Sequence, residues 1–443
     1  MSWFSFLSVL IPVLALFAYL NHRFVRLPDT VGITAVGVAV SVLLTLGASW
    51  LPGLSASATQ FARSFSFSSL VFKGILSFLL FAGALHVDVQ ALARRKAVVL
   101  TLATVGVLVA TAMTGLGLWE LLHVTGIGIS LLSCMLFGAL IAPTDPIVVQ
   151  GLLRSSGMDP QLQTDITGES LFNDGTAVVV FSLLLELSAG GHWPSAQHVA
   201  WLLVREAGGA LLFGGLLGYL ACLALRDVKS YAVEVLITLA LPTAGYSMAM
   251  HLGVSAPLAV VCMGLVLGYH GQRYSISSQT REDLFNFWEL IDELLTLVLF
   301  GLVGLELLAL RIDLATVAMS LLALPVVLLG RWCSVAVALR LSRWKSAVQG
   351  SRLEQQRHRL QTLRALTWGG LRGGISIALV LALPAFPGSA LLVSATYAVV
   401  LFGLLVQAPT LPKVLRAAGC RTPEPPAEVA SGETPPTSSI KSA

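Results

Sequence analysis

The sequence predicts an all-α membrane protein with about 13 transmembrane helices, and three observations carry this prediction. Of the 443 residues, 56% are hydrophobic and 11% are charged, whereas a soluble protein carries about 25% charged residues. Apolar stretches of about 20 residues, the length that crosses a bilayer, recur along the chain. Basic residues gather at alternate connections between these stretches, as the positive-inside rule requires.

Each predicted span is an apolar stretch between polar or charged connections. The first lacks the basic segment and the small-residue cleavage site of a signal peptide, so we expect it to remain in the protein. The connections near residues 124, 252 and 312 are very short. The predicted spans cover residues 3–20, 30–51, 66–86, 97–121, 127–151, 165–188, 198–225, 231–250, 254–270, 284–309, 314–340, 361–384 and 389–412.

The distribution of positive charge predicts the orientation of these spans. If the amino terminus lies outside the cytoplasm, 21 of the 27 Lys and Arg residues fall on the cytoplasmic side and two fall in outer loops. The other four lie within spans: Lys73, Arg205, Arg331 and Arg372. We therefore predict a multi-pass protein of the bacterial inner (plasma) membrane, with a periplasmic amino terminus and a cytoplasmic carboxy terminus.

Thirteen spans can be divided into two six-helix repeats separated by a linker helix. Corresponding spans are then seven apart, and this odd offset makes the repeats inverted. Both span five (127–151) and span twelve (361–384) are interrupted. The first contains Pro143 and Pro146, and the second contains Gly369, Gly370, Gly373, Gly374 and Pro384. Paired breaks of this kind mark the binding site of a transporter. We predict one transmembrane transporter domain over residues 1–420 and a disordered cytoplasmic tail over 421–443.

The first break contains an acidic residue, Asp145, between its two prolines. An ionisable residue inside the membrane costs about 2.5–3.5 kcal/mol on insertion scales, so it is a candidate for function. Carbonyl groups freed by the break, the Thr144 hydroxyl and the Asp145 carboxylate are hard oxygen ligands that suit a small cation. The alternative is a proline kink in which Asp145 caps the following half-helix.

The next span carries Glu169, Asn173 and Asp174. Glu169 and Asn173 are four residues apart and share a helix face, whereas Asp174 points about 140° away from Glu169. We expect Asp174 to face Asp145 in an ion cavity and Glu169 to face a structural partner. The alternative is one buried polar network that serves helix packing.

Two arginines within spans need a compensating charge. Arg331 follows a long apolar run in span eleven, and our preferred partner for it is Glu169. Arg372 lies between glycines in GGLRGG, where it could hold a counter-charge near the broken span. By contrast, we expect Lys73 and Arg205 to extend to the membrane surface or pair locally. The acidic residues of span ten have no primary role in this interpretation, and the alternative is that they line the cavity; they are Asp292, Glu293 and Glu306.

Six segments, in order between Phe78 and Pro412, resemble the NhaP-like branch of the monovalent cation/proton antiporters, which includes the eukaryotic sodium/proton exchangers. FGALIAPTDPIVV resembles the TDP segment of that family, and ITGESLFNDGTAVVVF resembles its GESLxND helix. The other four segments are EVLITLALPTAGYSM, FWELIDELLTLVLFGLVGLEL, LLGRWCSV and LTWGGLRGGISIALVLALP.

The resemblance implies a homodimer in the lipid bilayer, with spans five and twelve crossing at the ion site. It implies that Asp145 and Asp174 bind the cation, Na⁺, with further oxygens from Thr144 and Ser170 and with Asn173 as their neighbour. It also implies that Glu169 pairs with Arg331 and that Arg372 is the arginine of the GLRG segment. The Asn173–Asp174 pair, in place of two aspartates, is associated with electroneutral exchange in this superfamily.

Two positions depart from the pattern of the family. Ala82 stands where many relatives have the glutamate of LLFEGGL, and Thr296 stands where relatives often have asparagine. Both departures bear on ion selectivity rather than on the type of transport.

Together these observations predict a secondary transporter that exchanges Na⁺ or Li⁺ for H⁺ and serves pH and sodium homeostasis. The alternative with the same fold is K⁺/H⁺ exchange. We expect no enzyme activity, no cofactor and no nucleic-acid partner. An intramembrane aspartyl protease using Asp145 and Asp174 would need YD, GxGD and PAL motifs, which the sequence lacks. A carrier of organic anions, using Arg331 and Arg372, does not account for the carboxylates at the break.

Overall fold

A computed structural model of the chain describes residues 3–50, 52–63, 66–145, 160–190, 195, 197, 201–202, 204–228, 230–275, 278–309, 314–342, 352–384, 386 and 388–418. All regular secondary structure in these residues is helical, which confirms the predicted all-α class. The prediction of a disordered tail over 421–443 lies outside the described residues.

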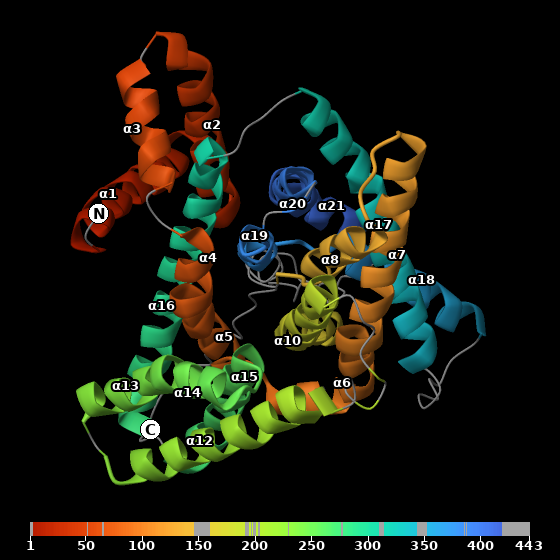
Figure 1. The fold of residues 1–443 in the computed structure, drawn as a ribbon. Coiled ribbons are helices and arrows are strands. Elements are labelled where there is room, and N and C mark those ends of the chain that lie inside the picture. The colour runs from red at the N-terminus through yellow and green to blue at the C-terminus, as the bar shows by residue number, and fades with distance from the viewer. Residues whose placement is uncertain are drawn as a thin grey trace, which may run out of the picture.

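Nineteen helices make up the described part of the chain (Figure 1). Short π-helical turns join several of them into longer continuous helices, for example α6 to α7 and α13 to α14. Their bounds are α1 Trp3–Leu20, α2 Asp29–Leu46, α3 Pro52–Arg63, α4 Phe67–Leu70, α5 Leu76–Leu85, α6 Val89–Thr101, α7 Val107–Val124, α8 Leu131–Ile141, α10 Pro160–Gly190, α12 Gly209–Arg226, α13 Tyr231–Ala240, α14 Tyr246–Leu252, α15 Ala256–Val266, α16 Ser278–Glu306, α17 Leu314–Ser342, α18 Arg352–Trp368, α19 Gly374–Leu381, α20 Ser389–Phe402 and α21 Ala408–Ala418.

These helices account for the predicted spans. Eight helical segments among the described residues are long and apolar enough to cross a membrane, and three further apolar helices are shorter. Each predicted span coincides at least in part with a described helix. The helix α3 was not predicted, because its sequence PGLSASATQFAR contains few large apolar residues.

The fourth span also begins earlier than the apolar stretch predicts. The carboxylate of Asp88 accepts hydrogen bonds from the backbone N–H groups of Gln90 and Ala91 at 2.8 and 3.1 Å, and so caps the first turn of α6. The cluster Arg94–Lys96, which we expected in a cytoplasmic loop, therefore lies on this helix. Capping starts the helix before its apolar part begins.

The helices form two groups that pack against each other (Figure 1). In the first group α16 packs against α2 and α5, and α15 packs against α5 and α12. In the second group α7 packs against α8 and α17, α10 against α6 and α8, and α17 against α20. Contacts of α10 with α5 and α15, and of α19 with α4 and α16, join the two groups.

Both predicted breaks are present in the described residues, at the centre of the second group. The helix α8 ends at Ile141, and residues 142–145 continue without helical structure. The other broken segment leaves the helix after Trp368 and re-enters one at Gly374. The backbone N–H of Asp145 donates a 2.8 Å hydrogen bond to the carbonyl oxygen of Leu371, so the two breaks meet. Pro146 lies outside the described residues.

Two adjacent glycines on α12 provide a test of this packing. A Cβ atom on Gly214 would collide with the backbone carbonyl of Ala259 on α15, whereas a Cβ on Gly215 would meet no atom within 4 Å. We expect Gly214→Ala to lower the free energy of unfolding by about 1–3 kcal/mol through overpacking. Gly215→Ala should leave it unchanged or raise it by about 0.5–1 kcal/mol, because alanine favours the helix.

Thermal unfolding of both variants in the same detergent would measure the difference. Equal melting temperatures for the two would contradict the close approach of α12 and α15.

Candidate functional site

The site is built where the two breaks meet. Thr144 and Asp145 follow the end of α8, and Gly373 precedes the first turn of α19. A Cβ atom on Gly373 would collide with the carboxylate of Asp145, so glycine is required for this approach. The amino end of α19, with its partial positive charge, therefore lies beside that carboxylate.

The helix α10 holds the first break in place through two hydrogen bonds. The Ser170 hydroxyl donates to the carbonyl oxygen of Thr144, and the Asn173 side-chain amide donates to the Thr144 hydroxyl at 2.8 Å. All three residues are buried. The oxygen of the same side-chain amide, Asn173 Oδ1, has no hydrogen-bond partner among the described residues. Four of the predicted site residues thus lie together, since Asp145 directly follows Thr144.

A cavity of about 60 Å³ opens beside this contact and is lined by both predicted aspartates, Asp145 and Asp174. Asp174 is 4% exposed, and its Oδ1 atom accepts no hydrogen bond from the described residues. A buried carboxylate oxygen without a partner is costly unless a proton, a water or a cation occupies the adjoining space. The cavity exceeds the space that one water molecule needs, about 10–15 Å³. The other lining residues are Val71, Leu76, Leu79, Leu80, Gly83, Ser170, Leu171, Asp292, Leu299 and Ile375.

A buried ion pair lies behind α10, on the side away from Asp174. The guanidinium of Arg331 on α17 donates to both carboxylate oxygens of Glu169, and the Nη2 to Oε2 distance is 2.9 Å. Arg331 also donates to the carbonyl oxygen of Leu366, near the end of α18, at 3.0 and 3.2 Å. This one side chain therefore joins α10, α17 and the helix that precedes the second break.

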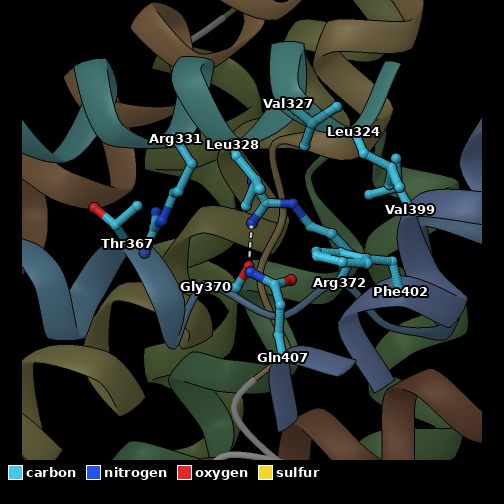
Figure 2. Close-up of a pocket in the computed structure, with 10 residues that line it drawn as sticks. All are labelled: Leu324, Val327, Leu328, Arg331, Thr367, Gly370, Arg372, Val399, Phe402 and Gln407. Atoms are coloured by element: carbon cyan, nitrogen blue, oxygen red, sulfur yellow. Dashed lines mark hydrogen bonds between the residues drawn. The ribbon is translucent and has the colours of Figure 1, made fainter. Parts of the chain in front are cut away.

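Arg372 lies in the second break and is also buried. Its Nη1 donates a 3.1 Å hydrogen bond to the carbonyl oxygen of Gly370, and its Nε has no partner among the described residues. Figure 2 shows this arginine beside Arg331 and Gln407 at a cavity of about 10 Å³. The side chain satisfies a backbone carbonyl that the interruption of the helix leaves free.

One feature of the site was predicted only as an alternative, and a second was not predicted. Asp292, on α16, lines the cavity opposite the breaks. Its position seven residues before Leu299, which also lines the cavity, places both on one helix face and was the available signal. Arg95 on α6 forms an ion pair with Asp165 on α10, with a 2.8 Å distance from Nε to Oδ1. Arg95 falls between the third and fourth predicted spans.

The ion pair behind α10 leads to a prediction about stability. Replacing Glu169 or Arg331 singly by alanine leaves the other charge buried without its partner, and should lower the free energy of unfolding by about 3–5 kcal/mol. The double variant should lose less than the sum of the two single losses, because it leaves neither charge behind. Thermal unfolding of the four proteins gives the coupling energy, and strictly additive losses would show that the pair contributes nothing.

Comparison with known proteins identifies antiporters that resemble this chain. The chain is 42% identical to the Na⁺/H⁺ antiporter NhaP of Pseudomonas aeruginosa, over 92% of this chain and 95% of that protein. It is 32% identical to the Na⁺/H⁺ antiporter NhaH of Halobacillus aidingensis, over 90% and 93% of the two chains. Its fold matches the structure of the sodium proton antiporter MjNhaP1 from Methanocaldococcus jannaschii at pH 8 with a TM-score of 0.69 at 20% identity, covering 94% of this chain and 99% of that one.

Residues 12–417, nearly the whole helical part of the chain, match the family described as sodium/hydrogen exchanger, transmembrane. The match includes both breaks, the two aspartates of the cavity and the buried ion pair. It places the protein among transporters and not among enzymes. The chain belongs to the sodium/hydrogen exchanger family.

Proposed function

We propose that the protein exchanges Na⁺ for H⁺ across the bacterial inner membrane and that Asp174 and Asp145 are the carboxylates that carry the exchange. The observation that supports this most is the cavity at the crossing of the two breaks, which both aspartates line. The polar part of its lining, the carboxylates of three aspartates and the Ser170 hydroxyl, consists of oxygen ligands that suit a hard cation. The relatives named for sodium and proton exchange cover more than nine-tenths of their own length in the match.

The proposed mechanism is competition between two ligands for one carboxylate. A charged carboxylate that is nine-tenths buried is costly without a counter-ion, and either a proton or a cation removes that cost. Asp174 holds one of them at a time. If the two loaded states alone allow the helix groups to change their relative position, a sodium ion leaves only when a proton has replaced it.

The residues around Asp174 have separate roles in this proposal. Asp145 gives the second carboxylate, and Thr144 and Ser170 hold the non-helical segment against α10 and contribute oxygens to the cation. Asn173 positions the Thr144 hydroxyl. The ion pair of Glu169 and Arg331 holds α10 in register.

Arg372 offsets the negative charge of the site from within the second break. The side chain is buried, and the helix ends that meet at the breaks leave carbonyl groups free. We further propose a homodimer embedded in lipid, with the amino terminus in the periplasm and the carboxy terminus in the cytoplasm. Na⁺ is the main cation in this proposal, and Li⁺ or K⁺ can compete for the same oxygens.

The first test replaces the central carboxylate. Asp174→Asn should abolish exchange, because an amide can neither release a proton nor bind Na⁺ as an anion does. Proton efflux from everted vesicles, followed as Na⁺, Li⁺ and K⁺ are added in turn, measures the exchange and ranks the cations. Glu186→Gln is the matched control, since Glu186 lies on the same helix with an exposed side chain and should keep its activity. Sodium-dependent proton movement in Asp174→Asn would remove Asp174 from the mechanism.

The second test concerns the stoichiometry. Exchange of one Na⁺ for one H⁺ moves no net charge, and Asn173 cannot carry the second proton that an aspartate could. An imposed membrane potential should therefore leave the exchange rate in proteoliposomes unchanged to within about 20%, although each elementary charge moved would be worth about 2.3 kcal/mol per 100 mV. An acceleration by an inside-negative potential, with net proton uptake, would show that more protons than cations move in each cycle.

A further inference from the structure

One wall of the ion cavity belongs to a different helix group from the wall that carries Asp145 and Asp174. The wall without these two aspartates is formed by α5 and α16. The two helices pack against each other, and α16 also packs against α2. The helix α16 runs beside the central helices in Figure 1 and also contacts α19, which begins at the second break. Any polar group on the inner face of α16 therefore faces the proposed cation site across the boundary between the two groups.

The inner face of α16 carries two polar side chains in consecutive turns. Asp292 and Leu299 both line the cavity, and Thr296 lies between them at spacings of four and three residues, on the same face. Thr296 is 4% exposed, and its Oγ1 has no hydrogen-bond partner among the described residues. A buried hydroxyl without a partner is unusual in a folded protein and indicates a ligand or an ordered water.

On the other side of the cavity, Asp174 also has a buried side-chain oxygen, Oδ1, without a hydrogen-bond partner among the described residues. Asp174 lines the cavity from α10 and Asp292 lines it from α16, on the helix face that Thr296 shares by its spacing. Carboxylate and hydroxyl oxygens are ligands for small hard cations.

We propose that α16 provides a second cation position, formed by the carboxylate of Asp292 and the hydroxyl of Thr296, that Na⁺ occupies on its way to or from Asp174. This inference rests on the proposed Na⁺/H⁺ exchange and names further residues for it. The two carboxylates would share a cation unequally. Asp174 binds it in exchange for a proton, whereas Asp292 raises its local concentration and lowers the cost of removing its water shell.

The position of these residues also makes them determinants of selectivity. Thr296 and Ala82 are the two places where the chain departs from the family pattern given above, and both are buried. The helix α5 carries no carboxylate, and Asp292 supplies one to the cavity from the neighbouring α16.

The test compares two neutralising substitutions at adjacent positions. Asp292→Asn and Glu293→Gln each remove one negative charge, but Asp292 lines the cavity and the Glu293 side chain is exposed. Sodium-driven proton movement in proteoliposomes should show a half-saturating Na⁺ concentration about five- to tenfold higher for Asp292→Asn, with a limiting rate within about twofold of the unchanged protein. Glu293→Gln should leave both values within about twofold, and Asp292→Glu should restore the affinity in large part.

Thr296→Val removes the hydroxyl with little change of shape and should raise the half-saturating concentration by about two- to fivefold. If Asp292→Asn does not fold, Thr296→Val takes its place as the test variant. Equal Na⁺ affinities for Asp292→Asn and Glu293→Gln, or an unchanged affinity in Thr296→Val when Asp292→Asn is unfolded, would overturn the inference.

A binding measurement separates this inference from the proposed exchange. Thermal unfolding of the purified proteins over a series of NaCl concentrations, with choline chloride keeping the ionic strength constant, reports Na⁺ binding without transport. A Na⁺-dependent rise in melting temperature that needs about five- to tenfold more Na⁺ in Asp292→Asn supports the second position even if no protons move. If exchange is normal and the Na⁺ dependence of the melting temperature is the same in Asp292→Asn as in the unchanged protein, the result supports the exchange and rejects the second cation position.

Discussion

In the interior of a membrane each peptide N–H and C=O group must find a partner within the protein, and the whole site depends on how this chain meets that constraint. Residues 142–145 and 369–373 are not helical, so they lose the hydrogen bonds that a continuous helix would supply. They recover part of them from each other, through the Asp145 N–H and the Leu371 carbonyl. Ser170 and Asn173 on α10, together with Arg372 and Arg331, satisfy further groups around the breaks. Interrupting two helices in this way places a set of oxygen atoms beside one small cavity.

Much of this architecture could be predicted from the sequence, because membrane insertion leaves a strong record in it. Apolar length and the alternation of positive charge predicted where the helices lie, and the predicted all-helical class is confirmed by the structure. The positions of the breaks also followed from local chemistry, since proline and glycine interrupt helices by known means. The predicted helix ends were wrong where a capping residue starts the helix before its apolar stretch begins, as Asp88 does for α6.

Contacts between distant helices were harder to predict, because a single sequence records no distances. The partner of Arg331 could be guessed, since a buried guanidinium needs a carboxylate and few are present. The partner of Arg95 could not, because a basic residue at a span end normally extends to the membrane surface. Asp292 was underrated for a related reason. Its place near the start of an apolar stretch is typical of a helix end, whereas its position beside the cavity depends on which helices stand opposite.

The ion pair of Glu169 and Arg331 joins residues that are 162 positions apart. During synthesis Glu169 enters the membrane long before Arg331 has left the ribosome, so for that interval α10 holds a carboxylate with no permanent counter-charge. The Glu169 carboxylate on this helix thus lacks its partner until five further spans have been made. Assembly of the second helix group is consequently ordered in time, because α10 is made well before the helix that carries its counter-charge. A nascent chain that ends before α17 would hold the Glu169 carboxylate in the membrane without its partner.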